Sequence, residues 1–422
     1  MSSSRSFRLA FAILPVIGSA LLIAATGGGA APPRPRPTLT EALRSARQDI
    51  GIADGSLTGS GAVTLDEAIA KARLIAVGED HVTREIPAFV SALCKKTAPE
   101  LSGLVLEAGP RALEAISPAL HSRDRIRQME AFNRRYPSGI AFLDSRADND
   151  MAAECLALQP RMKLVGIDQE FLGSAGLLID LILREHLSAP ARQEMTRLRR
   201  LEEAASSAAA KSGNPGDLLL VSISPTDLER ARRGLATGGT QRARMIFGEF
   251  ERSREMFLSK GNASNQDRAL LLKSNLRAGL PAHGKVIFKM GDWHLYRGYN
   301  PLNNRDVGNW VAERADEEGQ ASLHILILGE KGVHALYGGY ERPLKLEPFV
   351  MTDDPDYKWL RIALDARGPA RGGTWDMFDL RGLRDQKLAD MPFEWRRVLD
   401  GYDFLILIPE LTPSSHIDSP AR

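Results

Sequence analysis

Residues 74–81 read Leu-Ile-Ala-Val-Gly-Glu-Asp-His, four apolar residues followed by a glycine and three polar residues. A continuous apolar run of this length is typical of a strand that is covered on both faces, as in a parallel sheet. In an open parallel sheet, ligands bind beyond the carboxyl ends of the strands. We therefore expect Glu79 and His81 to lie where such a sheet carries its chemistry.

Further short apolar runs predict the other strands of this sheet: residues 103–106, 164–167, 286–288, 323–328 and 404–408. Amphipathic stretches between them predict helices at residues 84–96, 111–134, 148–158 and 174–185. Strand and helix in repeated alternation predict an α/β fold with a mostly parallel central sheet flanked by helices. Residues 350–382, rich in Asp, Gly and Arg, predict a long loop before a last helix and strand.

Residues 188–283 break this alternation, because they are rich in Ala, Arg, Glu and Leu, with breaks at 213–215, 238–239 and 261–262. They predict a helical insertion. The insertion follows the strand that ends before Asp168 and precedes the strand that ends before His294. We therefore expect it to cap the carboxyl edge of the strands and to shape access to the crevice there.

The first 31 residues predict a signal peptide. Arg5 and Arg8 precede an uncharged apolar stretch at 9–25, and small residues follow it. An uncleaved N-terminal anchor is the alternative. The mature protein would then be exported, to the periplasm or the outside, with a Pro-rich spacer and an N-terminal helix at 32–64. Residues 65–422 would form the α/β domain.

The charge balance argues against nucleic acid as a partner. The chain has 55 Lys and Arg against 53 Asp and Glu, and removal of Arg5 and Arg8 leaves 53 of each. A protein that binds phosphate backbones carries a basic excess, which is missing here. We expect a small-molecule or peptide substrate, and no membrane contact beyond a possible N-terminal anchor.

Cys94 and Cys155 are the two cysteines of the chain, too few for a four-cysteine metal site. Cys94 shares a helical face with Ile86 and Val90, the spacing of a buried stripe. The favoured prediction is therefore two buried apolar thiols. Export would permit a disulfide, which is the alternative.

Residues capable of chemistry follow four of the predicted strands. They are Glu79, His81, Glu107, Asp168 and His294. Because the carboxyl ends of parallel strands share one edge of a sheet, these five predict a single site. We expect His81, Glu107 and His294 to face one crevice within about 12 Å of one another.

The residue types suit the activation of water. Histidine titrates near neutrality and can take and return a proton, and a nearby carboxylate can fix its tautomer. His81, His294 and Glu107 could instead hold a divalent metal, which lowers the pKa of bound water. No Gly-x-Ser-x-Gly elbow follows a strand, so a serine nucleophile has no support. We interpret the remaining histidines as structural or surface residues: His121, His186, His283, His324, His334 and His416.

These motifs resemble those of a known superfamily. It unites erythromycin esterases, ChaN-like haem-binding lipoproteins and TIKI/TraB metalloprotease-like proteins. The shared pattern is Gly-x-x-His after the first strand, Glu after the second, and a second Gly-x-x-His after a late strand. Here these are Gly-Glu-Asp-His at 78–81, Glu107 in Leu-Glu-Ala-Gly, and Gly-Asp-Trp-His at 291–294. The resemblance covers residues 65–335.

The resemblance implies a His/Glu site able to activate water, but not one substrate. Erythromycin esterases usually have one more residue between Glu and His than this chain, so macrolide hydrolysis is not carried over. TIKI-like members imply metal-dependent peptide cleavage, and ChaN-like members imply haem. Two hypotheses follow: an exported hydrolase of esterase or peptidase type, metal-assisted or not, and a non-catalytic protein that binds haem or another small ligand.

Overall fold

The computed structural model describes residues 35–368 and 374–417. The predicted signal peptide lies outside these residues. The elements below belong to the unit Pro37–Arg422.

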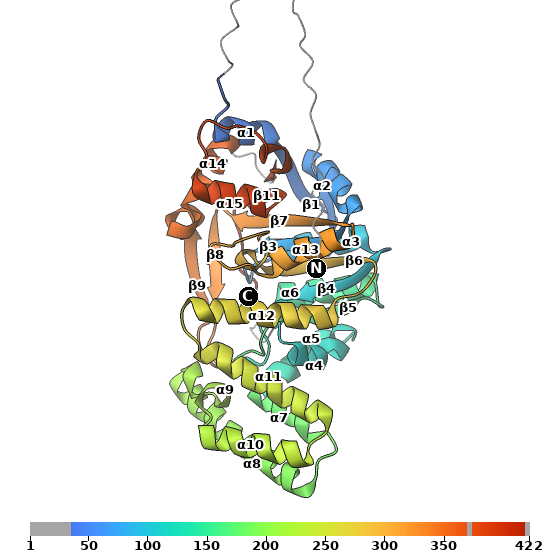
Figure 1. Cartoon of the computed structure of the whole chain (residues 1–422), viewed down its shortest axis with the longest axis vertical. Coiled ribbons are helices and arrows are strands. Elements are labelled where there is room, and N and C mark those ends of the chain that lie inside the picture. The colour runs from blue at the N-terminus through green and yellow to red at the C-terminus, as the bar shows by residue number, and fades with distance from the viewer. Residues whose placement is uncertain (1–34, 369–373, 418–422) are drawn as a thin grey trace, which may run out of the picture. The chain divides into compact units, whose positions relative to one another are not determined.

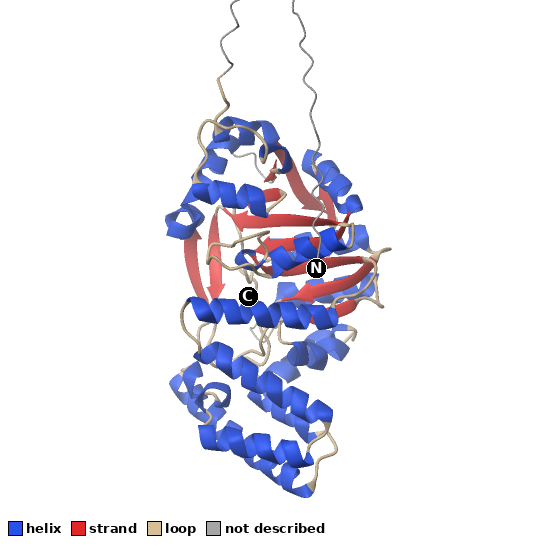
Figure 2. Ribbon diagram, in the orientation of Figure 1, coloured by secondary structure: helices blue, strands red, loops and turns tan. Residues whose placement is uncertain are grey.

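The centre of the fold is a nine-stranded sheet with the order β2-β1-β10-β11-β7-β3-β6-β4-β5 (Figures 1 and 2). Six neighbouring strands, from β11 to β5, run parallel. Strand β10 is antiparallel to both β11 and β1, and β2 is antiparallel to β1. The predicted α/β fold with a mostly parallel sheet is therefore confirmed. The strands are β1 Arg47–Ala53, β2 Ser56–Thr58, β3 Ala72–Glu79, β4 Leu101–Leu106, β5 Lys163–Gly166, β6 Lys285–Gly291, β7 Ala321–Gly329, β10 Trp375–Asp379 and β11 Phe404–Ile408.

Apolar side chains on both faces explain why the central strands read as continuous apolar runs. In β3, Ile75 and Val77 belong to the core on one face, while Leu74 and Ala76 belong to the core on the other. Helices cover both faces, with α13 in front of the sheet in Figure 1. The helices outside the insertion are α1 Leu39–Ala46, α2 Ser60–Lys71, α3 Glu85–Thr97, α4 Pro110–Leu120, α5 Arg125–Arg135, α6 Arg146–Leu158, α13 Val307–Glu317, α14 Arg361–Arg367 and α15 Phe393–Gly401.

The predicted insertion is helical, and it divides into two parts. Helix α12 packs on the sheet, where Leu272 and Leu276 join the same core as Val165 of β5. The preceding helices pack with one another around a core of their own, which includes Leu198 and Phe247. These helices are α8 Ala189–Ser212, α9 Leu219–Ser222, α10 Pro225–Gly238 and α11 Gln241–Leu258, followed by α12 Asn262–Gly279. Helix α7 Ala175–Leu183, which precedes the predicted insertion, packs in the same separate core.

Some predicted boundaries are corrected. The helix expected at 111–134 is two helices, α4 and α5. Residues 350–382, expected to be loop, contain α14 and the strand β10. A two-stranded hairpin, β8 Lys331–Leu336 and β9 Lys345–Val350, was not expected. Short 3₁₀ helices complete the list at Pro215–Asp217, Asp292–His294, Met351–Asp353, Pro355–Leu360 and Arg381–Leu383.

The prediction of two free thiols is wrong, because Cys94 and Cys155 form a disulfide. Both residues are buried, as their helical faces indicated. The two faces pack against each other, however, and place the Cα atoms 5.4 Å apart. The bridge joins α3, which follows His81, to α6.

Within the described ranges, no helix combines the length and the apolarity needed to cross a bilayer.

Candidate functional site

Four neighbouring parallel strands bring the predicted residues to one edge of the sheet. In the order β3-β6-β4-β5, these strands end at or just before Glu79, His294, Glu107 and Asp168. The apolar runs decide where each strand ends, and the polar residue that follows each run emerges at the shared edge. The convergence expected from the sequence is therefore present.

Glu107 lies between the two histidines. Its Oε2 is 3.7 Å from Nε2 of His81, and its Oε1 is 3.4 Å from Nε2 of His294. The backbone N–H of Gly291 donates to Oε2 at 2.8 Å. Only glycine fits at 291, since a Cβ there would lie 2.7 Å from Nε2 of His81.

Glu107 stays charged although it is buried, with an exposed fraction of 5%. Burial disfavours the carboxylate, but the adjacent His294 and His81 outweigh burial and hold the pKa of Glu107 well below its ordinary value. The site therefore has a fixed negative charge between two imidazoles.

His81 is held at both ring nitrogens and on one ring face. Nδ1 lies 3.0 Å from Oε1 of Glu79, and the ring stacks on Phe142 with centroids 4.2 Å apart. Because Glu79 accepts a hydrogen bond from Nδ1–H, the neutral ring has its lone pair on Nε2, which faces the crevice. Burial opposes a charged ring, yet the carboxylates of Glu107 and Glu79 outweigh it and raise the pKa of His81.

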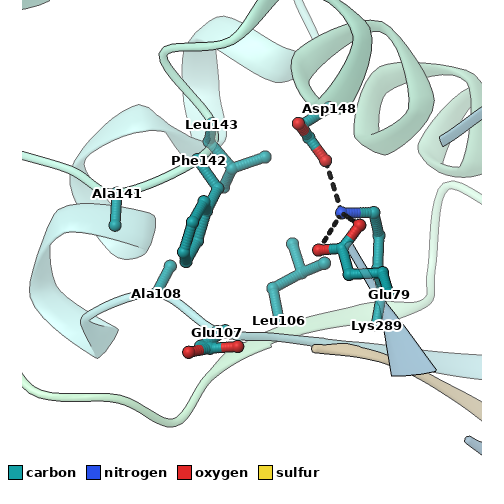
Figure 3. A pocket seen from close by; sticks show the side chains of 9 residues that line it. All are labelled: Glu79, Leu106, Glu107, Ala108, Ala141, Phe142, Leu143, Asp148 and Lys289. Carbon is teal, nitrogen blue, oxygen red and sulfur yellow. Dashed lines mark hydrogen bonds and ion pairs between the residues drawn. The ribbon is translucent and has the colours of Figure 1, made fainter. Parts of the chain in front are cut away.

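A buried lysine, Lys289, forms an ion pair with Glu79. Nζ of Lys289 lies 2.6 Å from Glu79 and 2.5 Å from Oδ1 of Asp148 (Figure 3). Figure 3 shows this group on one side of a small cavity and the ring of Phe142 on the other, with Glu107 at its base. Burial raises the pKa of Asp148. For Glu79, Lys289 is the main opposing influence to burial, and the pKa of Glu79 is lowered.

His294 has its own carboxylate partner. Oδ2 of Asp306 lies 2.8 Å from its Nδ1, which directs Nε2 toward Glu107. Burial disfavours the charged ring, but Glu107 and Asp306 outweigh it and raise the pKa of His294 to about 10. At neutral pH this ring is therefore positively charged, with protons on both nitrogens, whereas an ordinary histidine is mostly neutral.

Arg268 from α12 connects the carboxylates. Its guanidinium lies 2.5 Å from Asp168, 2.7 Å from Glu107 and 3.2 Å from Nε2 of His294. Asp168 thus reaches the site through this arginine. Helix α12 is also the part of the insertion that packs on the sheet, while α8 to α11 pack around the separate helical core.

Four further residues of the site were not predicted from the sequence: Phe142, Arg268, Lys289 and Asp306. Lys289 had a signal, since it is a charge within an otherwise apolar strand, Val-Ile-Phe-Lys-Met. Asp306 precedes a helix, where an aspartate is ordinary as an N-cap, and its Oδ1 does accept from the backbone N–H of Val307. Arg268 is one of many arginines in the insertion and gave no local signal.

Two histidines interpreted as non-functional have different surroundings. His324 is fully buried inside β7, with Nδ1 2.8 Å from the carbonyl oxygen of Leu295. Burial lowers the pKa of His324 to about 3, so it stays neutral. His334 of the hairpin lies 2.8 Å from Asp80, the neighbour of His81, and stacks on Phe349.

The described residues do not fit a metal ion. Nowhere in this part of the chain do three or more His, Cys, Asp or Glu side chains form a group that could hold one. The guanidinium of Arg268 already occupies the carboxylates of Glu107 and Asp168, which a metal ion would need as ligands. We derive no chemical step through a metal.

Comparisons with known proteins give the fold. No family model matches the chain. No curated protein matches it either. Three solved structures resemble it, each at 14% sequence identity. A succinoglycan biosynthesis protein has a TM-score of 0.55 over 89% of this chain and 97% of its own. A Bacillus cereus protein has a TM-score of 0.54 over 89% and 98%.

The third structure is a mutant of the erythromycin esterase EreC in its open conformation. Its TM-score is 0.54, over 85% of this chain and 95% of that one. At this identity the likeness concerns the fold alone. The chain therefore has an erythromycin esterase-like fold.

Proposed function

We propose that this chain is an exported hydrolase of the esterase or peptidase type, in which His81 activates water and His294 protonates the leaving group. The observation that carries the proposal is the position of Glu107. Its two oxygens face the Nε2 atoms of two histidines that come from different strands.

The two histidines have different surroundings, which suit them to different roles. His81 donates a hydrogen bond from Nδ1 to Glu79, which leaves the Nε2 lone pair of the neutral ring free to act as a general base. Its side chain is 32% exposed, so water reaches it. His294, with its pKa raised to about 10, holds a proton at neutral pH and can serve as the acid.

Glu107 would stabilise the imidazolium that forms when His81 takes a proton from water. The N–H of Gly291 and the guanidinium of Arg268 hold this carboxylate in place from two sides. Arg268 would also keep Asp168 in a fixed relation to it. A preorganised charge of this kind requires no rearrangement during the reaction.

Export is supported by two independent features. One is the signal-peptide pattern in the first 31 residues. The other is the buried disulfide between Cys94 and Cys155, because such bridges persist mainly in oxidising compartments.

The test is hydrolysis of short-chain aryl esters and of unstructured peptides by the purified protein, with and without added Mn²⁺, Co²⁺ or Zn²⁺. We expect His81→Ala and Glu107→Gln to lower kcat by roughly 100-fold or more. His121→Ala, an exposed histidine at the end of α4, is the matched control and should change nothing. Activity that survives His81→Ala would refute the proposal. A Soret band without hydrolysis would favour the ligand-binding alternative.

A further inference from the structure

Two residues beside the His81 ring have left-handed backbone conformations. Val82 follows His81 directly and has a φ of 57°, and Phe142, on which the ring stacks, has a φ of 62°. A β-branched or bulky side chain rarely adopts this conformation, because its Cβ approaches the backbone too closely. Such strain persists only where the surroundings impose it, and it concentrates at functional sites.

The C-terminal segment, residues 411–417, holds the loop that contains Val82. The backbone N–H of Ser414 donates to the carbonyl of Val82 at 2.9 Å, and the N–H of Arg84 donates to the carbonyl of Thr412 at 3.1 Å. Between these bonds, Thr83 and Pro413 form an antiparallel bridge. The loop is thus paired with the C-terminal segment on both sides of Thr83, directly after the strained Val82.

The same segment holds the loop that contains Phe142. The hydroxyl of Ser145 donates to the hydroxyl of Ser414 at 2.8 Å, and the N–H of Arg146 donates to the carbonyl of Ser415 at 2.8 Å. Ser145 in turn donates its backbone N–H to the carbonyl of Phe142 at 2.8 Å. A series of hydrogen bonds therefore connects Phe142, which stacks on His81, to residues 414–415.

Ser414 is the junction between the two loops. Its backbone N–H binds the His81 loop, while its Oγ binds Ser145 and accepts from the N–H of Ala147 at 3.0 Å. Its exposed fraction is 2%, so water does not replace these bonds. We propose that Ser414 is a positioning residue: the C-terminal segment clamps both strained loops and so fixes the ring of His81 between Phe142, Glu79 and Glu107.

The proposed hydrolytic function explains why such a clamp would be useful, and the inference rests on that function in this respect. His81 must keep Nε2 toward Glu107 while Nδ1 stays on Glu79. Relaxation of either loop would tilt the ring out of this arrangement. A misplacement of about 1 Å is enough to cost a large part of the rate.

Ser414→Ala tests the clamp, because it removes the hydroxyl bonds and keeps the backbone bond to Val82. Ser145→Ala removes the same hydroxyl pair from the other side. Ser415→Ala is the matched control, since that side chain is exposed and its contact to Arg146 is through the backbone. We expect the first two variants to lower kcat roughly 10- to 100-fold with KM changed by less than about twofold, and the control to behave as wild type.

The second measurement does not depend on turnover. Phe142 stacks on His81, so the His81 ring protons should show an upfield ring-current shift and contacts to Phe142 protons in NMR spectra of selectively labelled, full-length protein. Ser414→Ala and Ser145→Ala should lose much of this shift at unchanged pH. Val82→Gly, which accepts a positive φ without strain, should restore part of it in the Ser414→Ala background.

The outcomes separate the two ideas. A folded Ser414→Ala protein with the wild-type ring-current shift would overturn the clamp, whatever its activity. If the wild-type protein hydrolyses nothing, the proposed function fails, while the NMR comparison still decides the clamp. If Ser414→Ala does not fold, the milder Ser145→Ala variant decides it by the same shift.

Discussion

The carboxylate of Asp306 lies 2.8 Å from Nδ1 of His294 and so determines which ring nitrogen faces the crevice. The same aspartate caps α13 through its other oxygen, which accepts from Val307 at 2.8 Å. One side chain thus starts a helix and orients a proposed acid. Asparagine can replace the cap, because it is as favourable at that position, but it does not replace the negative charge.

Asp306→Asn should therefore separate the two roles. We expect kcat to fall by roughly 100-fold, because the ring of His294 loses the carboxylate that orients it and stabilises its charged form. Loss of the negative charge should also lower the pKa of His294 from about 10. The alkaline limb of the kcat–pH profile should then move to lower pH, with little change in Tm. A profile identical to wild type would show that His294 is not the acid.

Arg268→Met should destabilise the fold as well as slow the reaction. It leaves Glu107 and Asp168 buried without their shared cation, and breaking such a pair typically costs about 3–5 kcal/mol. Urea unfolding followed by circular dichroism would measure this loss. Arg277→Met is the control, because Arg277 lies exposed on the same helix. Equal stability losses in the two variants would contradict the role given to Arg268.

Glu170→Gln should change the dependence of stability on pH. Glu170 accepts from the backbone N–H groups of Arg111 and Ala112, and burial raises its pKa from an ordinary value of 4.5 to about 8. Between these values the folded state binds more protons than the unfolded state. The stabilising contribution is therefore complete below about pH 4.5 and is lost as the pH rises toward 8.

Glutamine keeps the shape and the hydrogen-bond acceptor but does not titrate. The difference in unfolding free energy between wild type and Glu170→Gln should thus shift in favour of the variant by up to about 1.4 kcal/mol per pH unit across this window. Chemical unfolding at pH 5, 6, 7 and 8 gives the measurement. A constant difference over the four values would mean that Glu170 is already ionised at pH 5.

His324→Ala should affect stability and leave turnover per folded molecule nearly intact. The ring fills a fully buried position in β7 and interacts with the carbonyl of Leu295, away from the crevice. We expect a loss of about 1–3 kcal/mol, read from thermal unfolding. A fall in kcat comparable to that of His81→Ala would instead place His324 in the reaction.

The strands and their polar ends could be predicted because they depend on local sequence. An apolar run decides the strand, and the first polar residue after it marks the edge, as at Glu79, Glu107 and Asp168. The parallel arrangement then brings these residues together without further information. The longest-range contacts have no such local origin: Arg268 is separated from Glu107 by 161 residues.

Which helices pack against each other could also not be predicted from the sequence. The burial of Cys94 and Cys155 could be predicted from the apolar faces of their helices. That these two helices pack against each other depends on the tertiary structure. Lys289 was visible as a charge inside a strand, whereas its partner Asp148 lies at the start of α6. A pattern shows that a charge must be compensated, and the packing determines by which residue.

The C-terminal segment is synthesised long after the loops that it binds, and this delay affects when the site can form. Strand β11 enters the middle of the sheet between β10 and β7, and residues 411–417 then bind the loops beside His81. Ser414 follows Val82 by 332 residues (414 − 82), which a ribosome needs on the order of tens of seconds to add. A nascent chain that already carries both proposed catalytic histidines still lacks the segment that seats one of them. The ring of His81 therefore cannot reach its final position before residues 411–417 have been synthesised.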